Sequence, residues 1–467
     1  MKKNFKYILA TVLCAGISSH ISAQELRASY FMHSSHFRHQ MNPALLDNTY
    51  MGIPFLGNVN VGASGNVGLS NFVYKLHNNP NYSLTTFMNP DISANAFLGD
   101  LSSKNKINAN VNYNIASVAF RAFKGINVVE LNVRSNTSLC LPYELFDFMK
   151  NTGAKERYSI ENLGARTQNY MELALGHSHI INEKLTVGGK VKFLFGAAYA
   201  DLKVDHMDIT MNDNQWVINS DAQLNAAILK SEFKHDDDND PNTTQPNRKK
   251  VNGIDDVKFG LPGFGLAVDL GATYKVMDGL TVSGAITDLG FISWSNTNLA
   301  SSKGVYTFDG FKNPIYVTGP DTGDNKIGDQ FEALGDDIEK MFSLYDDGKG
   351  GKTTALAATI NLGAEYEMPF YRKLSAGFLY TARMNGMYTW HQGMLSANVR
   401  PLNWLEASLN TSASTNGWCF GGMLSIHPKG FTFYVGSDRL IGKVSKEFIP
   451  INSMNANVCF GFAIPLK

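Results

Sequence analysis

Two histidines with one residue between them, His177 and His179, are a candidate metal-binding pair. In a β-strand this spacing places both imidazoles on the same face, where they could bind one metal ion. The pair shares its parity with Leu173 and Leu175, however, so the imidazoles would project among apolar side chains. We therefore predict a position at a lipid interface near a turn, and no metal site.

Clustered aspartates are the next candidates for chemistry. The run Asp236–Asp240 and the pairs Asp321/Asp324 and Asp346/Asp347 could bind Ca²⁺, but they lack the regular ligand spacing and terminal Glu of an EF-hand loop. We interpret them as solvated loop charge.

Motifs of known catalytic chemistry are absent from the sequence. It contains no GxSxG, HExxH, phosphate-binding loop or Cys pair at metal spacing. We expect no enzymatic activity, no metal and no cofactor. A hydrolase site assembled from dispersed Ser and His residues is the alternative that stays open.

The element that the rest of the chain repeats is residues 261–277, in which apolar and small or polar side chains alternate. The apolar positions are Phe264, Leu266, Val268, Leu270, Ala272, Tyr274 and Val276. A period of two residues indicates a strand. From Phe264 to Tyr274 such a strand climbs about 24 Å at a tilt near 45°, which suits the apolar band of a membrane barrel. A long strand of a large soluble sheet is the alternative.

Polar side chains on the opposite parity should face water inside such a barrel. Residues 107–115 alternate between apolar side chains and asparagines, and residues 185–199 carry two lysines opposite an apolar face. The residues that we predict to face the lumen are Asn108, Asn110, Asn112, Asn114, Lys190, Lys192 and Asp269. On a soluble sheet the same side chains would form the solvated face.

The N-terminus has the pattern of a secretory signal peptide. Lys2, Lys3 and Lys6 precede an apolar run, and Ala23 ends it with a small side chain, so we predict a signal peptide over residues 1–23. Its removal would leave three cysteines, an odd number that does not predict a disulfide framework.

Charge and hydropathy exclude two classes of protein. The whole chain has 41 basic and 41 acidic residues, and losing the three leader lysines makes the mature chain slightly acidic, so we expect no nucleic-acid partner. Beyond the leader no run of 18 apolar residues exists, so a helical membrane span is not expected. A mature chain that enters a bilayer must therefore do so as a closed barrel.

The predicted organisation is a short N-terminal segment followed by one large barrel. We expect residues 24–51 to form a plug or lead-in and residues 52–467 an all-β transmembrane antiparallel barrel of about 14 to 16 strands. The glycine-rich residues 52–70 could be the first strand or part of the plug. Long external loops are expected near 141–165, 232–258 and 300–352, the last with an amphipathic helix around Phe331–Tyr345. Short turns on one side are expected near Lys124, Asn182, Asp213, Asp278, Arg372, Leu402 and Pro428.

Two finer features complete the prediction. A helical piece should follow Pro142, over Tyr143–Met149. The strand after residue 280 changes parity near Asp288–Gly290, which indicates a β-bulge.

Three stretches give the sequence a family likeness. Asn42-Pro43-Ala44 follows the leader, and Gly263–Val276 and Leu280–Trp294 are long alternating strands. With them the chain resembles the FadL-like superfamily of outer-membrane proteins, and most closely Bacteroidetes barrels that share features with the type IX secretion protein PorV. The resemblance implies a barrel in the outer membrane of a Gram-negative bacterium, with Asn42, Pro43 and Ala44 inside it.

The same resemblance implies two functions. One is passage or binding of a small hydrophobic compound through a plugged lumen, in a barrel surrounded by outer-membrane lipid. The alternative is a non-enzymatic interaction barrel that holds or shuttles secretion-system or surface proteins.

Overall fold

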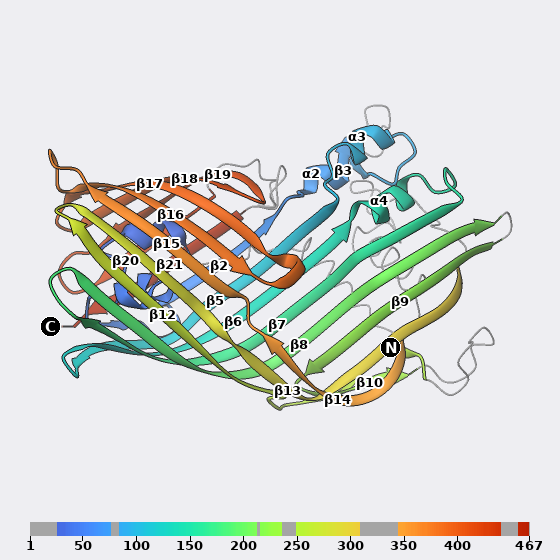
Figure 1. Cartoon of the computed structure of the whole chain (residues 1–467), viewed down its shortest axis with the longest axis horizontal. Helices are drawn as coiled ribbons and strands as arrows, with labels where there is room; N and C mark the ends of the chain where they lie inside the picture. Colours follow the sequence, from blue (N-terminus) through green and yellow to red (C-terminus); the bar gives the residue numbers. More distant parts are fainter. Residues whose placement is uncertain are drawn as a thin grey trace.

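The computed structural model is dominated by one antiparallel sheet that closes on itself (Figure 1). It describes residues 26–75, 84–212, 215–235, 249–308, 344–439 and 456–466. Within these residues the sheet forms a closed barrel of 14 strands, which confirms the predicted fold class.

The barrel closes where the two ends of the chain meet. β1 (Tyr50–Gly52) and β2 (Asn58–Gly65) follow one another along one line of the wall. They pair with β5 (Lys104–Ala122) on one side and with β21 (Ala456–Pro465) on the other. The first part of the glycine-rich run therefore belongs to the wall.

The other strands of the wall pair with their sequence neighbours, except that β8 pairs with β12 and β13 with β15. They are β6 (Gly125–Pro142), β7 (Arg157–Ile180), β8 (Leu185–Asn212), β12 (Gly263–Met277), β13 (Leu280–Phe308), β15 (Ala358–Glu367), β16 (Leu374–Met384), β17 (Trp390–Leu402), β18 (Leu405–Ser414), β19 (Gly417–Ile426) and β20 (Thr432–Ser437).

The side chains of β12 alternate as predicted. Phe264 and Leu270 are 54% and 57% exposed on the outside, whereas Ala267 and Asp269 are buried. Large apolar side chains are exposed in the same way on other strands, among them Phe120, Leu175, Val191, Phe291, Leu362, Phe378, Leu395, Leu409, Phe420 and Val458. A closed wall with an apolar exterior is the arrangement that a bilayer requires of a sheet.

The predicted bulge is present in β13. The register with β12 shifts between Val268 and Leu270, and Asp288 has a positive φ of 59°. The Asp288 backbone N–H donates a hydrogen bond to Oδ1 of Asp269 at 2.7 Å, which fixes the extra residue. The bulge thereby brings two aspartates together at one level of the barrel.

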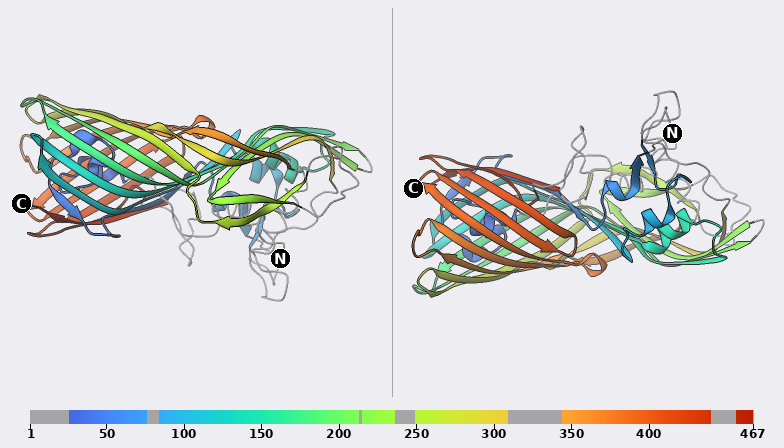
Figure 2. Two further views of the ribbon diagram at one scale, coloured as in Figure 1. Left: turned by 90° about the horizontal axis from the view of Figure 1, so that it is seen from below. Right: turned by 90° about the horizontal axis from the view of Figure 1, so that it is seen from above.

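Several strands continue well beyond the barrel (Figures 1 and 2). β7, β8 and β13 have 24, 28 and 29 residues, where about 10 residues suffice to cross a bilayer. β9 (Gln215–Ile228) pairs with the far halves of β8 and β13, and β14 (Tyr345–Ala355) pairs with β13. The prediction of a short turn near Asp213 on the same side as the others is therefore wrong, because β8 and β9 join at the opposite end.

The strand extensions also correct the predicted loops. In the 232–258 region, β10 (Lys230–His235) and β11 (Val251–Lys258) pair with each other, with residues 236–248 outside the described chain. The 300–352 region begins and ends as strand, in β13 and β14. Its predicted helix lies outside the described residues except at its end, where Tyr345 begins β14. Alternation continues past the membrane because these strands pair with each other and bury one face.

Short helices cover that face of the extension (Figure 2). α2 (Leu69–Phe72), α3 (Ala94–Leu98) and α4 (Tyr143–Lys150) accompany a small hairpin of β3 (Val73–Lys75) and β4 (Leu84–Thr86). α4 is the predicted helical piece, and it reduces the predicted 141–165 loop to the connection between β6 and β7. The helices and the extended strands share a hydrophobic core, which we call the extension core. It includes Phe97, Phe146, Phe148, Ile160, Val204, Met207, Ile209, Ile218 and Leu224. None of the described helices has both the length and the apolar character needed to cross a membrane.

Candidate functional site

The N-terminal segment lies inside the barrel, where it is drawn in blue (Figures 1 and 2). We call residues 26–49 the lumen segment. It contains three short 3₁₀ helices, η1 (Arg27–Phe31), η2 (Arg38–Gln40) and η3 (Pro43–Leu45), and most of its side chains are buried. Its first described residues are fixed to the wall, because the backbone N–H groups of Arg27 and Ala28 donate to the Asp438 carboxylate at 2.8 and 2.9 Å.

Asn42, Pro43 and Ala44 form the turn that packs against the wall. Oδ1 of Asn42 accepts a hydrogen bond from the Ala44 N–H at 3.0 Å, and its Nδ2 donates to the Tyr30 hydroxyl at 3.1 Å. The turn fits because Gly188 of β8 and Gly271 of β12 lie beneath it. A Cβ at Gly271 would be 2.0 Å from Asn42 Oδ1, and one at Gly188 would be 2.3 Å from the Pro43 carbonyl carbon.

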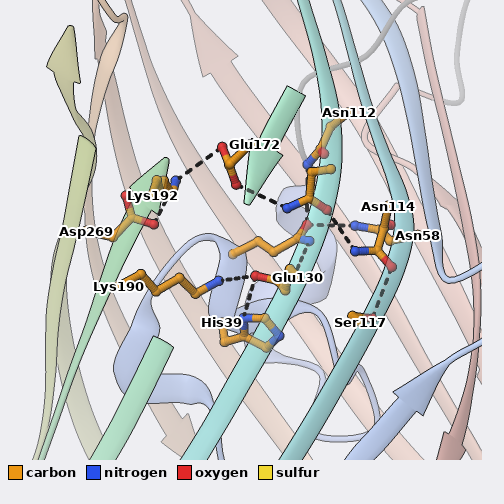
Figure 3. A network of polar contacts seen from close by, with 12 residues as sticks. His39, Asn58, Asn112, Asn114, Ser117, Glu130, Glu172, Lys190, Lys192 and Asp269 are labelled. Carbon is orange, nitrogen blue, oxygen red and sulfur yellow. Dashed lines mark hydrogen bonds and ion pairs between the residues drawn. The ribbon is translucent and has the colours of Figure 1, made fainter. Parts of the chain in front are cut away.

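A layer of buried charges crosses the lumen beside this segment (Figure 3). Nζ of Lys190 is 2.7 Å from Oε2 of Glu130. Nζ of Lys192 is 2.8 Å from Asp269 Oδ2 and 2.6 Å from Asp288 Oδ1. The structure thus brings Lys190, Lys192 and Asp269 together inside the barrel, from the neighbouring strands β8 and β12.

A fourth carboxylate, that of Glu172, extends the charged layer across β6 and β7. Oε2 of Glu172 is 3.4 Å from Arg134 Nε and 3.8 Å from Lys192 Nζ. Its Oε1 accepts a hydrogen bond from Asn132 Nδ2 at 3.1 Å. Each carboxylate in this layer therefore has a cation near it, which is the condition for keeping charge in a buried site.

Gln40 connects the lumen segment to this layer. Its Nε2 donates to Glu130 Oε1 at 2.9 Å, and its Oε1 accepts from Asn58 Nδ2 at 2.8 Å and from Asn112 Nδ2 at 3.3 Å. The same side chain thus contacts β2, β5 and β6. Its amide can serve all three partners because it has both donors and an acceptor.

The predicted row of asparagines is buried along β5, and its members have different surroundings. Asn114 Nδ2 donates to Asn132 Oδ1 at 2.7 Å, and Asn112 contacts Gln40 as described. Asn110 lines a cavity, and Asn108 is 4% exposed.

Sequence reasoning missed Gln40 and did not single out Glu130, Glu172 or Arg134. The alternation of β6 and β7 places these three charged residues opposite apolar neighbours, as it does for Lys190. Parity was therefore the signal that could have found them. Gln40 lies in an irregular segment, where parity carries no information.

Burial sets the protonation of two histidines in the lumen segment. Burial lowers the pKa of His39 to about 3, and the Lys190 ammonium contributes in the same direction. Burial likewise lowers the pKa of His36 to about 4. Both imidazoles are therefore neutral at pH 7, and His39 Nε2 is 2.7 Å from the Tyr50 hydroxyl.

Cavities adjoin the lumen segment on two sides. One of about 40 Å³ is lined by polar side chains that include Arg27, Arg134, Asn110, Asn112 and Arg383. The other, of about 640 Å³, is lined by both segment and wall residues near the short turns, including Arg38, Asp47, Lys124, Glu365 and Glu367. The lining of this larger cavity also includes apolar side chains, among them Leu45, Leu46, Ile126 and Ile180.

The remaining candidates for chemistry lie outside this site. His177 and His179 are half-buried on the outer face with Leu173 and Leu175, and His177 Nδ1 is 2.9 Å from Asn127 Oδ1. Cys140, Cys419 and Cys459 are buried thiols, and no disulfide joins them to one another. Within the described ranges, no group of three or more His, Cys, Asp and Glu side chains could hold a metal ion.

These observations define the class of protein: a membrane-spanning β-barrel whose interior holds its own N-terminal segment. Residues 43–438 match the model of a protein family described as a family of unknown function, DUF5723. The chain belongs to this family.

Similar solved structures are also barrels. The toluene transporter TodX of Pseudomonas putida shares 10% identity over 95% of both chains, with a TM-score of 0.40. A FadL homologue of Pseudomonas aeruginosa shares 9% identity over 91% of both chains, with a TM-score of 0.34. The translocator domain of NalP from Neisseria meningitidis shares 8% over 90% of this chain and 89% of its own, with a TM-score of 0.32. No curated protein matches this sequence.

Proposed function

We propose that this chain is a gated barrel of a Gram-negative outer membrane, closed by its lumen segment and opened when that segment moves. The observation that carries this proposal is the position of the segment between two cavities, about 40 and 640 Å³ in volume. Displacing the segment would join the two spaces along the barrel axis. Outer-membrane lipid is the partner of the apolar exterior.

Opening would have to separate apolar contacts of the segment with the wall, in clusters that join Met32 and Phe37 to Tyr434 and Phe31 to Leu379, as well as hydrogen bonds. The hydrogen bonds between the segment and the wall mostly involve side chains, such as Arg27 Nη1 to Gln392 Oε1 at 2.8 Å and Asn361 Nδ2 to the Met41 carbonyl at 2.9 Å. Water can replace such bonds at low net cost, because one intramolecular hydrogen bond contributes only about 1 kcal/mol. The segment is continuous with β1, so Tyr50 is the natural pivot.

The charged layer inside the barrel favours passage of polar solutes over the hydrophobic compound that the family likeness implied. A hydrophobic molecule would have to pass the layer formed by Lys190, Lys192, Glu130 and Glu172. Desolvating these groups without replacing their partners is costly. A small hydrophilic solute would make hydrogen bonds with the same groups.

Removal of the segment tests the gate. Deleting residues 26–48, with the signal peptide retained, should raise solute influx in reconstituted liposomes, measured by swelling in isotonic sugar. Heat-modifiable migration in detergent gels confirms that the shortened barrel is folded. A folded variant with the flux of the full chain would refute the gate.

The strand extension supports a second candidate, a barrel that binds exported or surface proteins, as PorV-like barrels do. The extension core lies outside the apolar belt of the barrel, and a simple hairpin loop would not need a hydrophobic core of this size. A photo-crosslinking residue at exposed Gln223 of β9 should then capture a specific exported protein in intact cells, whereas one at Lys124, on a short turn, should not. Absence of any Gln223-dependent product would remove this candidate.

A further inference from the structure

The smaller lumen cavity gathers three arginines from three parts of the chain. Arg27 belongs to the lumen segment, Arg134 to β6 and Arg383 to β16, and all three line the same space of about 40 Å³. Asp288 is the only acidic residue among those lining it, and its Oδ1 is 2.6 Å from Lys192. The cavity lining therefore has an excess of positive charge.

Each guanidinium is held in place by a defined neighbour, which for Arg134 is Glu172, with Nε 3.4 Å from Oε2. Arg27 lies over the Trp390 ring at 4.5 Å from its centroid, in a cation–π contact. Arg383 Nη2 donates to Asn136 Oδ1 at 2.6 Å. A guanidinium has five N–H donors in a rigid fork, so a single bond to a neutral amide does not use the capacity of Arg383.

The other walls of the cavity offer neutral hydrogen-bonding groups. Thr381 Oγ1 donates to Asn361 Oδ1 at 2.9 Å, and both side chains are at least nine-tenths buried. The segment itself contributes Met41, whose carbonyl accepts from Asn361 Nδ2. Polar groups held in fixed positions orient a ligand at small entropic cost.

From this arrangement we infer that the cavity is a binding site for a small hydrophilic anion that carries a carboxylate or phosphate group. Planar carboxylates match the guanidinium fork, and phosphate oxygens match it as well. A water needs about 10–15 Å³ of such space, so about 40 Å³ admits one anionic group of a few heavy atoms. This inference rests on the proposed gate and names the class of solute that it admits.

The position of the site relates binding to gating. Arg27 and Met41 belong to the lumen segment, while Arg134 and Arg383 belong to the wall. An anion bound between them contacts both bodies at once. Movement of the segment would take Arg27 away from the wall arginines and release the anion.

Equilibrium binding tests the site independently of transport. Malonate is titrated into the full chain in neutral detergent, with heat of binding as the readout, and inorganic phosphate is titrated as the second anion. We expect saturable binding of at least one anion, and binding of the neutral analogue malonamide to be at least about tenfold weaker, because charge-assisted hydrogen bonds are lost. This comparison needs no variant and cannot fail through misfolding.

Variants assign the binding to the arginines. Arg383→Gln should weaken binding of the preferred anion about tenfold or more, and Arg383→Lys should weaken it less, because it keeps the charge and loses the fork. Arg372→Gln, which removes a guanidinium paired with Asp278 on an exposed turn, should leave the affinity unchanged.

Three results would overturn the site: no saturable binding of either anion, equal binding of malonamide, or equal loss in Arg383→Gln and Arg372→Gln. A failed site with increased flux on deletion of the segment leaves the gate intact. Saturable binding with unchanged flux keeps the site and removes the gate.

Discussion

Nε2 of Gln40 donates a hydrogen bond to Oε1 of Glu130 at 2.9 Å, and this bond joins the lumen segment to the charged layer of the wall. Both side chains are almost fully buried. Glu130 also forms an ion pair with Lys190, so its carboxylate contacts both the lumen segment and the neighbouring wall.

Glu130→Ala should destabilise the folded barrel strongly. The change leaves the Lys190 ammonium buried without its carboxylate, and removing one partner of a buried ion pair costs about 3–5 kcal/mol. Unfolding in urea, followed by intrinsic fluorescence in detergent, measures the loss. Glu161→Ala, at an exposed site on β7, is the matched control and should leave the transition in place. Equal midpoints for the two variants would contradict the role of the pair.

Gln40→Ala should loosen the lumen segment without unfolding the barrel. Three hydrogen bonds are lost, and all three partners, Asn58, Asn112 and Glu130, are buried polar groups. We expect increased solute influx in liposomes and faster proteolytic cleavage within residues 26–49. Gln223→Ala removes an exposed glutamine from the extension and should change neither property. A tight, protected segment in Gln40→Ala would show that this side chain does not hold the gate.

Gly271→Ala should displace the Asn42-Pro43-Ala44 turn. The new methyl would be 2.0 Å from Asn42 Oδ1, so the turn has to move, at a cost of about 1–3 kcal/mol for overpacking. The expected result is a leaky barrel with a lower unfolding midpoint. Gly189→Ala is the control, since its methyl would meet its nearest neighbour, the Asp269 carbonyl oxygen, at 3.6 Å. If both variants have wild-type flux, the turn does not seal the lumen.

Acidification should weaken the seating of the segment. His39 and His36 have folded pKa values of about 3 and about 4, below the ordinary value of 6.5. The released or unfolded segment therefore binds protons that the seated one does not, and stability falls as the pH drops from about 6.5 toward 4. Each pH unit in that window costs about 1.4 kcal/mol per histidine.

Flux measured at pH 7.5 and pH 4.5 tests this prediction. We expect greater influx at pH 4.5 for the wild type and a smaller pH effect for His39→Gln. Glu130, Lys190, Tyr50, Arg38 and Asp47 surround the two imidazoles, and Glu130 partly opposes the effect of burial on His39. An identical pH response in wild type and variant would exclude His39 as the sensor.

The sequence by itself determined the local pattern of this protein. Alternation identified β12, placed Phe264 outside and Asp269 inside, and the parity change near Asp288 located the bulge. These features depend only on the two-residue period of a strand, which any strand of the chain displays without reference to its partners.

Only the tertiary structure decided how these faces are used. The membrane-length strands could not be separated by periodicity from the longer β7, β8 and β13, because the pattern continues wherever one face is buried, whether against lipid or against α4. Periodicity also could not show that Gln40 contacts Glu130, 90 residues away. Nor could periodicity show that Arg27, Arg134 and Arg383 line one cavity. Such contacts arise from barrel closure around an irregular segment, and closure is set by pairing between strands distant in sequence.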